Sequence, residues 1–322
     1  FRGGTGTMTN KDATGCERRI LEADDGHRIL VECWQPDGEV SALIHIVHGL
    51  AEHATRYERF ALQSIKQGYV VVAHNHRGHG EFCLPDGLGH YADKQGWDKV
   101  ISDMLLVQND LRDQYPEQRL ILMGHSMGSS IAQCFAMRHP DKIEALVLSG
   151  STWPNRKHLR VGKFLATIAV WINGRQAKSD FLNSISFGGF NKRFAPNRTQ
   201  FDWLSRDPDE VDKYIADPLC GAGSSNQLWR DLLGGMLEIS TADAVAGIPD
   251  IPVLILGGAV DPVGGSGRMA ALAEIYRANG HPDVTIEIYP DGRHEMLNET
   301  NRDEVTSDIL QWCNSALEST AT

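Results

Sequence analysis

A serine between two glycines, in Gly-His-Ser-Met-Gly at 124–128, is the feature of the sequence that points most directly to chemistry. It follows the apolar run 120–123 and precedes residues 131–137, whose apolar side chains have helical spacing. Gly-x-Ser-x-Gly between a strand and a helix is typical of a nucleophile elbow, a turn so sharp that its flanking residues must be small. We therefore predict that Ser126 is a nucleophile.

A serine hydroxyl needs a general base, and the base needs an orienting carboxylate. Such groups gather at the carboxyl ends of parallel strands. Asp261 follows the apolar run 252–256, and His294 follows the run 286–289. Either could be an ordinary turn residue, but the chain order Ser, Asp, His is that of α/β-hydrolases. We predict that His294 accepts the Ser126 proton and that Asp261 orients and stabilises the imidazole.

Two backbone N–H groups are predicted to bind the oxyanion of the reaction. Leu50 ends the segment His48-Gly49-Leu50 after the apolar run 42–47, and Met127 follows the serine. The loop after this strand supplies such a donor in hydrolases of this order. Loss of one donor typically costs about 3–4 kcal/mol of transition-state stabilisation. The alternative is an ordinary strand-to-helix turn that uses Gly49.

Strand-like and helix-like segments alternate over the first 150 residues and again from residue 252. Apolar strands separated by helices predict an α/β fold with a mostly parallel central sheet and helices on both faces. The alternation stops in between, where helix-like pieces predict a helical cap inserted after the sixth strand. We predict four parts: a leader before Met8 that is left over from cloning (1–7), the first part of the core (8–152), the cap (153–248) and the second part of the core (249–322).

The length, net charge and cysteine content of the chain restrict the class of protein to which it can belong. The length of 322 residues suits one core with a large insertion. A net charge of −11 argues against nucleic-acid partners and against electrostatic docking on anionic lipid. The six cysteines show no Cys-x-x-Cys and indicate free thiols in a reducing, cytoplasmic setting. The longest apolar run, 164–172, is too short to span a bilayer.

Four motifs together resemble the monoacylglycerol lipase and lysophospholipase-like branch of the α/β-hydrolase superfamily. They are His-Gly-Leu-Ala-Glu-His at 48–53 with Arg-Tyr at 56–57, Arg-Gly-His-Gly at 77–80, the elbow at 124–128 and Arg-His-Glu-Met-Leu-Asn-Glu at 293–299. The resemblance implies a capped serine carboxylester hydrolase that cleaves monoacylglycerol-like or lysophospholipid-like esters through an acyl-enzyme and needs no cofactor. It assigns the catalytic and oxyanion roles to the same residues: Ser126, Asp261, His294, Leu50 and Met127.

Glu52 and Arg56 match motif positions near the polar end of the family's pocket, which makes them candidate substrate contacts. The plainer interpretation, which we favour, is a local ion pair one helical turn apart. The sequence departs from the family at Asn75, where an aspartate is common. This departure puts in doubt any charge-dependent role for that loop.

The strongest rival hypothesis is a metal site. His74, His76 and His79 fit His-x-His-x-x-His after a strand, as in metallo-β-lactamase-like hydrolases. Those enzymes also need an aspartate directly before the third histidine, and Gly78 stands there. We therefore predict no metal. A non-catalytic binding protein of the same fold, an esterase of smaller non-lipid esters, and thioester or peptide cleavage by the same triad remain as alternatives.

The cap sequence carries many apolar residues, which suggests the class of substrate. They begin at helical spacing with Phe164, Leu165, Ile168, Val170, Trp171 and Ile172. Further aromatics follow at Phe181, Phe187, Phe190, Phe194, Phe201, Trp203 and Trp229. Most must form the cap's own core, but we predict that some line an acyl channel above Ser126, since large apolar groups suit an acyl chain. The expected partner is a small-molecule ester with such a chain.

Overall fold

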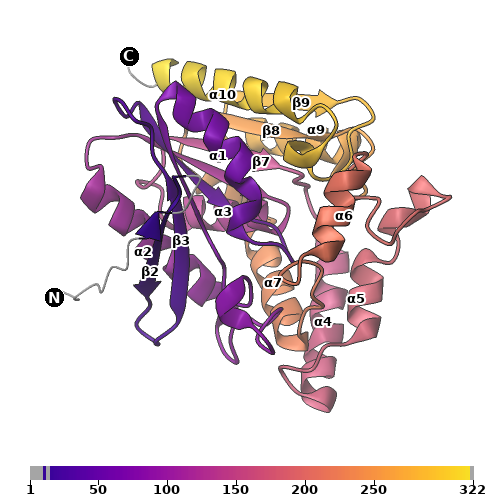
Figure 1. Ribbon diagram of the computed structural model, residues 1–322. Coiled ribbons are helices and arrows are strands. Elements are labelled where there is room, and N and C mark those ends of the chain that lie inside the picture. Colours follow the sequence, from indigo (N-terminus) through magenta and orange to yellow (C-terminus); the bar gives the residue numbers. More distant parts are fainter. Residues whose placement is uncertain (1–9, 12–14, 320–322) are drawn as a thin grey trace.

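A nine-stranded sheet forms the centre of the molecule, in a computed structural model that describes residues 10–11 and 15–319 (Figure 1). Its spatial order is β1-β2-β3-β5-β4-β6-β7-β8-β9. The pairs β1–β2, β2–β3 and β3–β5 are antiparallel, and every pair from β5 to β9 is parallel. The strands are β1 (Asn10–Lys11), β2 (Glu17–Glu22), β3 (Arg28–Trp34), β4 (Ala42–Val47), β5 (Tyr69–His74), β6 (Leu120–His125), β7 (Ala145–Ser149), β8 (Val253–Gly258) and β9 (Val284–Tyr289).

Helices cover both faces of this sheet, which explains why its central strands are continuous apolar runs. Every residue of β4, β5, β6, β7 and β8 is buried. Leu43 belongs to one core cluster and Ile44 to a second, because side chains alternate across the sheet. The first cluster includes α2 (Gly96–Gln114), α3 (Met127–Arg138) and α9 (Gly265–Ala278), and the second includes α1 (Glu58–Ser64) and α10 (Arg302–Ser319). The predicted α/β-hydrolase fold is confirmed.

The segment between β7 and β8 contributes helices but no sheet strand. It contains α4 (Arg156–Asn173), α5 (Asp180–Phe187), α6 (Pro208–Ala216), α7 (Asn226–Ile239) and α8 (Ala242–Ala246). The insertion follows the strand that the sequence indicated, but that strand is the seventh rather than the sixth. The difference is β1, whose two residues carry no apolar pattern that sequence analysis could detect. The predicted leader 1–7 lies outside the described residues.

Helix α4 packs against α7, as Figure 1 shows. Gly162 of α4 faces Leu233, and the amide of Asn226 donates to the carbonyl of Ala169 at 3.3 Å. The opposite face of α4 is open to solvent, with Phe164 64 % and Trp171 85 % exposed. Within the described residues, no helix combines the length and the apolar character needed to cross a bilayer.

Candidate active site

Ser126 occupies a strained turn between β6 and α3, with φ 52° and ψ −117°. A β-carbon at Gly124 would lie 2.4 Å from the carbonyl oxygen of Gly128, and one at Gly128 would lie 2.0 Å from that of Val47. No side chain fits at either position, so both glycines are required by the close approach of the backbones. The N–H of Ser126 donates to the carbonyl of Ser149 at 2.9 Å, which ties the turn to β7.

His294 and Asp261 form a buried hydrogen-bonded pair beyond the ends of β9 and β8. Nδ1 of His294 lies 3.0 Å from Oδ2 of Asp261. His294 is 2 % exposed and Asp261 is 3 % exposed. The other oxygen of Asp261 accepts the N–H of Val263 at 2.8 Å, which fixes the carboxylate. The imidazole therefore has one nitrogen held by a carboxylate, the arrangement that orients a general base.

The pKa of His294 is raised above its ordinary value. Burial alone lowers this pKa, but the charge and hydrogen bond of Asp261 raise it, and the carboxylates of Glu295 and Glu52 add to the effect. Negative charge around a buried imidazole favours its protonated form. The surroundings of His294 thus stabilise the imidazolium that proton transfer from a serine would create.

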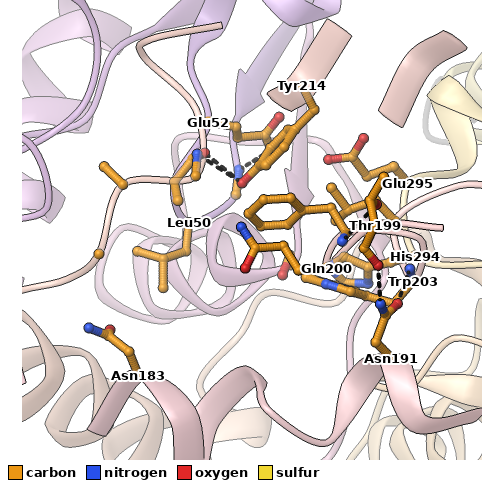
Figure 2. A pocket seen from close by; sticks show the side chains of 18 of the residues that line it. Leu50, Glu52, Asn183, Asn191, Thr199, Gln200, Trp203, Tyr214, His294 and Glu295 are labelled. Carbon is orange, nitrogen blue, oxygen red and sulfur yellow. Dashed lines mark hydrogen bonds between the residues drawn. The ribbon is translucent and has the colours of Figure 1, made fainter. Parts of the chain in front are cut away.

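Ser126 and His294 line one cavity of about 660 Å³, and Asp261 stands behind the imidazole. Figure 2 shows this cavity, with Leu50 and Asn183 on one side and His294 and Trp203 on the other. Among the described residues, the Ser126 hydroxyl makes no hydrogen bond with His294. Such contacts are often long without substrate and tighten in the Michaelis complex. The structure thus brings the three predicted residues together at one site.

Leu50 and Met127 each have a backbone N–H without a partner among the described residues. Leu50 lines the cavity, and Met127 is the first residue of α3, where the helix dipole favours negative charge. The peptide between Gly49 and Leu50 is held from its other side, because Nδ1 of His48 lies 2.8 Å from the Gly49 carbonyl. Both N–H groups are therefore candidates to bind an oxyanion, and this role stays a prediction.

Arg56 forms a buried network with two glutamates. Its guanidinium donates to Glu52 at 2.7 Å, as the favoured interpretation of a local pair expected. It also binds both oxygens of Glu295, at 2.7 and 2.6 Å. Glu52 accepts the Gly49 N–H at 2.5 Å, so the network joins the oxyanion loop to the residue after His294. Burial would raise the pKa of Glu295, but Arg56 holds it at about 2.

Sequence reasoning missed Glu295 as the partner of Arg56. The two residues are 239 positions apart, and the only signal was that Glu295 adjoins the predicted catalytic histidine. Glu52 lines the cavity, which is compatible with its predicted contact to substrate, whereas the lining does not include Arg56. The arginine therefore acts within the protein, between two loops of the site.

The His-x-His-x-x-His segment is not arranged as a cluster of metal ligands among the described residues. Nδ1 of His74 is occupied by a neighbouring buried histidine at 2.9 Å. The ring of His79 bonds to the Arg77 carbonyl at 2.9 Å and to the Ala51 N–H at 3.3 Å. Among the described residues, the histidines of this segment belong to no group of three ligand atoms close enough to share an ion. His79 ties this segment to the loop that bears Leu50, whereas both ring nitrogens of His76 are buried without a hydrogen-bond partner among the described residues.

The α4 residues predicted to line an acyl channel do not line the cavity, whereas Phe201 and Trp203 of the same predicted set do. The helical period identifies which side chains share a face, but not which face meets the core. Here the face toward α7 is buried, and the face that contains Phe164 and Trp171 is exposed. The insertion instead gives the cavity polar side chains, and these are Asp180, Asn183, Ser184, Asn191, Asn197, Thr199 and Gln200. Its apolar contribution is mainly Phe201, Trp203, Leu204 and Tyr214.

Comparison with known proteins places this geometry among ester hydrolases. Residues 38–301 match the family described as serine aminopeptidase, S33. The monoacylglycerol lipase of Mycolicibacterium smegmatis is 28 % identical, over 91 % of this chain and 95 % of the relative. The human monoglyceride lipase is also 28 % identical, over 90 % of this chain and 86 % of the relative. A solved carboxyl esterase from Bacillus coagulans, in complex with glycerol, is 26 % identical with a TM-score of 0.86, covering 94 % of this chain and 98 % of that one.

Substitution of Arg56 by alanine should destabilise the fold. It would leave Glu52 and Glu295 buried without their cation, and breaking a buried pair on one side typically costs about 3–5 kcal/mol. We expect the free energy of unfolding in urea to fall by that amount. Arg198, whose ion pair with Asp212 is exposed, supplies the control, since Arg198→Ala should cost at most about 1 kcal/mol. Unchanged stability in Arg56→Ala, with only a higher KM, would identify Arg56 as a substrate contact instead.

Proposed function

We propose that this chain, which belongs to the serine aminopeptidase S33 family and is a serine ester hydrolase, cleaves monoacylglycerol-like esters with Ser126 as nucleophile. One observation carries the assignment of residues. The strained serine and the imidazole held by Asp261 face one cavity, beside two N–H groups that are free among the described residues. These are the parts that two-step acyl transfer needs.

The first step would form an acyl-enzyme. Ser126 Oγ attacks the ester carbonyl carbon while Nε2 of His294 takes its proton. The carbonyl oxygen becomes an oxyanion, which the N–H groups of Leu50 and Met127 bind. The tetrahedral intermediate collapses, the bond to the alcohol oxygen breaks, and His294 returns the proton to that oxygen. The alcohol leaves, and the acyl group remains on Ser126.

The second step would repeat the first with water as the nucleophile. His294 removes a proton from water, and the hydroxide attacks the acyl carbonyl in the same oxyanion site. Collapse expels Ser126 Oγ, which regains its proton from His294, and the fatty acid is released. Asp261 keeps one imidazole tautomer in place and stabilises the imidazolium in both steps. The raised pKa of His294 is consistent with this role.

An ester rather than a peptide substrate is favoured by the carboxylates of the cavity. An aminopeptidase must bind the ammonium group of its substrate, which calls for an uncompensated carboxylate. The core contributes Glu52 and Glu295 to the cavity, and Arg56 binds both, which leaves the exposed Asp180 of the insertion as the carboxylate of the described lining without an ion pair. A neutral glycerol head group suits the amides and hydroxyls of the insertion wall better. The relatives named monoacylglycerol lipase or monoglyceride lipase support the same choice.

The exposed face of α4 suggests how a lipid substrate would be reached. Net charge argued against docking on anionic lipid, but the charge of this helix is opposite to that of the chain. Lys157, Arg160 and Lys163 are exposed on α4, which contains no acidic residue. Exposed apolar side chains lie on α4 and α5, and these are Val161, Phe164, Ile168, Trp171, Ile172, Phe181 and Ile185. Basic and apolar groups together suit an anionic lipid surface. The predicted cytoplasmic location stays a prediction.

Ser126→Ala should remove ester hydrolysis without loss of the fold. We expect turnover of monoacylglycerol to fall by at least about 10⁴-fold, because the nucleophile is gone. The melting temperature should be close to that of the parent, and labelling by a fluorophosphonate should disappear. Ser102→Ala, on the exposed side of α2, is the control and should keep both activity and labelling. A folded Ser126→Ala protein that still turns over would contradict the proposal.

The pH dependence should report the raised pKa of His294. The base acts only when neutral, so kcat/KM should rise with pH through an inflection above the ordinary histidine value of about 6.5. Asp261→Asn removes the charge that raises this pKa. We expect the inflection to move to lower pH and the plateau to fall by about 10⁴-fold. An inflection that does not move in Asp261→Asn would show that another group titrates.

The apolar face of α4 should matter only for substrate in a lipid aggregate. Trp171→Glu removes a large apolar group whose burial is worth about 1.5–3 kcal/mol, or about 10–100-fold in binding. Hydrolysis of monoacylglycerol in anionic vesicles should fall by that factor, while a water-soluble acetyl ester is cleaved at the parent rate. Ile215→Glu makes the same charge change at another exposed site of the insertion. Equal losses in both variants, or on both substrates, would refute a lipid-docking role.

A further inference from the structure

Three metal-ligating side chains meet where the insertion touches the core. His53 lies in the core loop that carries Glu52, Asp217 follows α6, and Cys220 is three residues further on. Their ligand atoms all lie within 4.8 Å of one another. Nε2 of His53 is 2.8 Å from Oδ2 of Asp217. Two chain segments more than 160 residues apart thus supply an imidazole, a carboxylate and a thiol at one point.

The electrostatic surroundings of this cluster favour a cation. The carboxylates of Asp217, Glu52 and Glu295 act on the Cys220 sulfur, and the guanidinium of Arg56 acts against them. Arg56 already binds Glu52 and Glu295, whereas Asp217 forms its ion pair with His53 alone among the described residues. Asp217 therefore brings a negative charge to a partly desolvated position, where no lysine or arginine of the described residues pairs with it. A divalent cation would balance it.

We propose that His53, Asp217 and Cys220 bind a zinc ion, with water as the fourth ligand. Nitrogen, oxygen and sulfur donors in one set match the borderline-soft character of Zn²⁺ and its four-coordinate preference. Cys220 is a half-buried cysteine that forms no disulfide. On binding, the zinc–sulfur bond forms, the thiol proton passes to solvent, and neutral His53 binds through Nε2.

The site would fasten the insertion to the loop that bears an oxyanion donor. The segment after Asp217 already touches this loop, since the Gly221 N–H donates to the Ala51 carbonyl at 2.9 Å. The hydroxyl of Tyr214 donates to the same carbonyl at 2.9 Å. Zinc would add a third connection at His53, close to both. We therefore expect zinc to raise the melting temperature of the protein, because it binds only the folded arrangement.

The test begins with metal-free protein titrated with Co²⁺, which takes the place of zinc and reports its ligands in the absorption spectrum. We expect a near-ultraviolet band from thiolate-to-cobalt charge transfer and visible bands of four-coordinate cobalt. Zinc should abolish both bands by displacement and raise the melting temperature. Absence of the thiolate band in the parent protein would overturn the proposal.

Variants identify the ligands. Cys220→Ala should lose the thiolate band, and its zinc affinity should fall by more than about 100-fold, since loss of an outer-shell partner alone costs about 10–100-fold. Cys83→Ala, at a half-buried cysteine outside the cluster, is the matched control and should keep the band. A band that survives in Cys220→Ala, or is lost in Cys83→Ala, contradicts the site. If Cys220→Ala does not fold, Asp217→Asn tests the site in its place, because this substitution preserves the size of the side chain. Unchanged zinc affinity in Asp217→Asn would also overturn the proposal.

Discussion

The buried guanidinium of Arg56 is the interaction on which the geometry of the site depends. It holds Glu52, which fixes the Gly49 N–H, and Glu295, which adjoins His294. The two loops come from opposite ends of the sequence, and the sheet alone does not set the distance between them. The same carboxylates raise the pKa of His294. Arg56 therefore fixes the position of two loops and also holds the carboxylates that favour protonated His294. A substitution at Arg56 would change the geometry of the site and its electrostatics together.

The insertion is anchored at the same place. The ring of Tyr214 lies over the guanidinium of Arg56, 4.9 Å from ring centre to carbon, and its hydroxyl reaches the Ala51 carbonyl. The pair of His53 and Asp217 lies beside it. A movement of the insertion would therefore first change the positions of the oxyanion loop and of Arg56. This explains how helices that contribute no predicted catalytic residue can still influence the catalytic geometry.

The parts of the site that could be predicted from sequence are those set by local geometry. The glycines around Ser126 are demanded by one turn. Asp261 follows the continuous apolar run of β8, and His294 follows β9, in which apolar and polar residues alternate. The partnership of Arg56 with Glu295 was not predictable, because it depends on how distant loops fold together. The exposed face of α4 was misassigned for a related reason. A helical period tells which side chains share a face, while contact with α7 decides which face is buried.

The polar side chains of the cavity wall and the exposed apolar side chains of α4 lie on two different surfaces of the insertion. Recognition of the head group and attraction to lipid would therefore be separate tasks, which a single acyl channel would have combined. The cavity at Ser126 has a volume of about 660 Å³, within the usual range of about 300–1,000 Å³ for a small-molecule site, and its insertion wall is rich in amides and hydroxyls. The larger apolar side chains of α4 lie outside it. In the proposed function, the cavity selects the head group, and the outer face of α4 attracts lipid. Because the two surfaces share no side chain, substitutions on one should leave the task of the other intact.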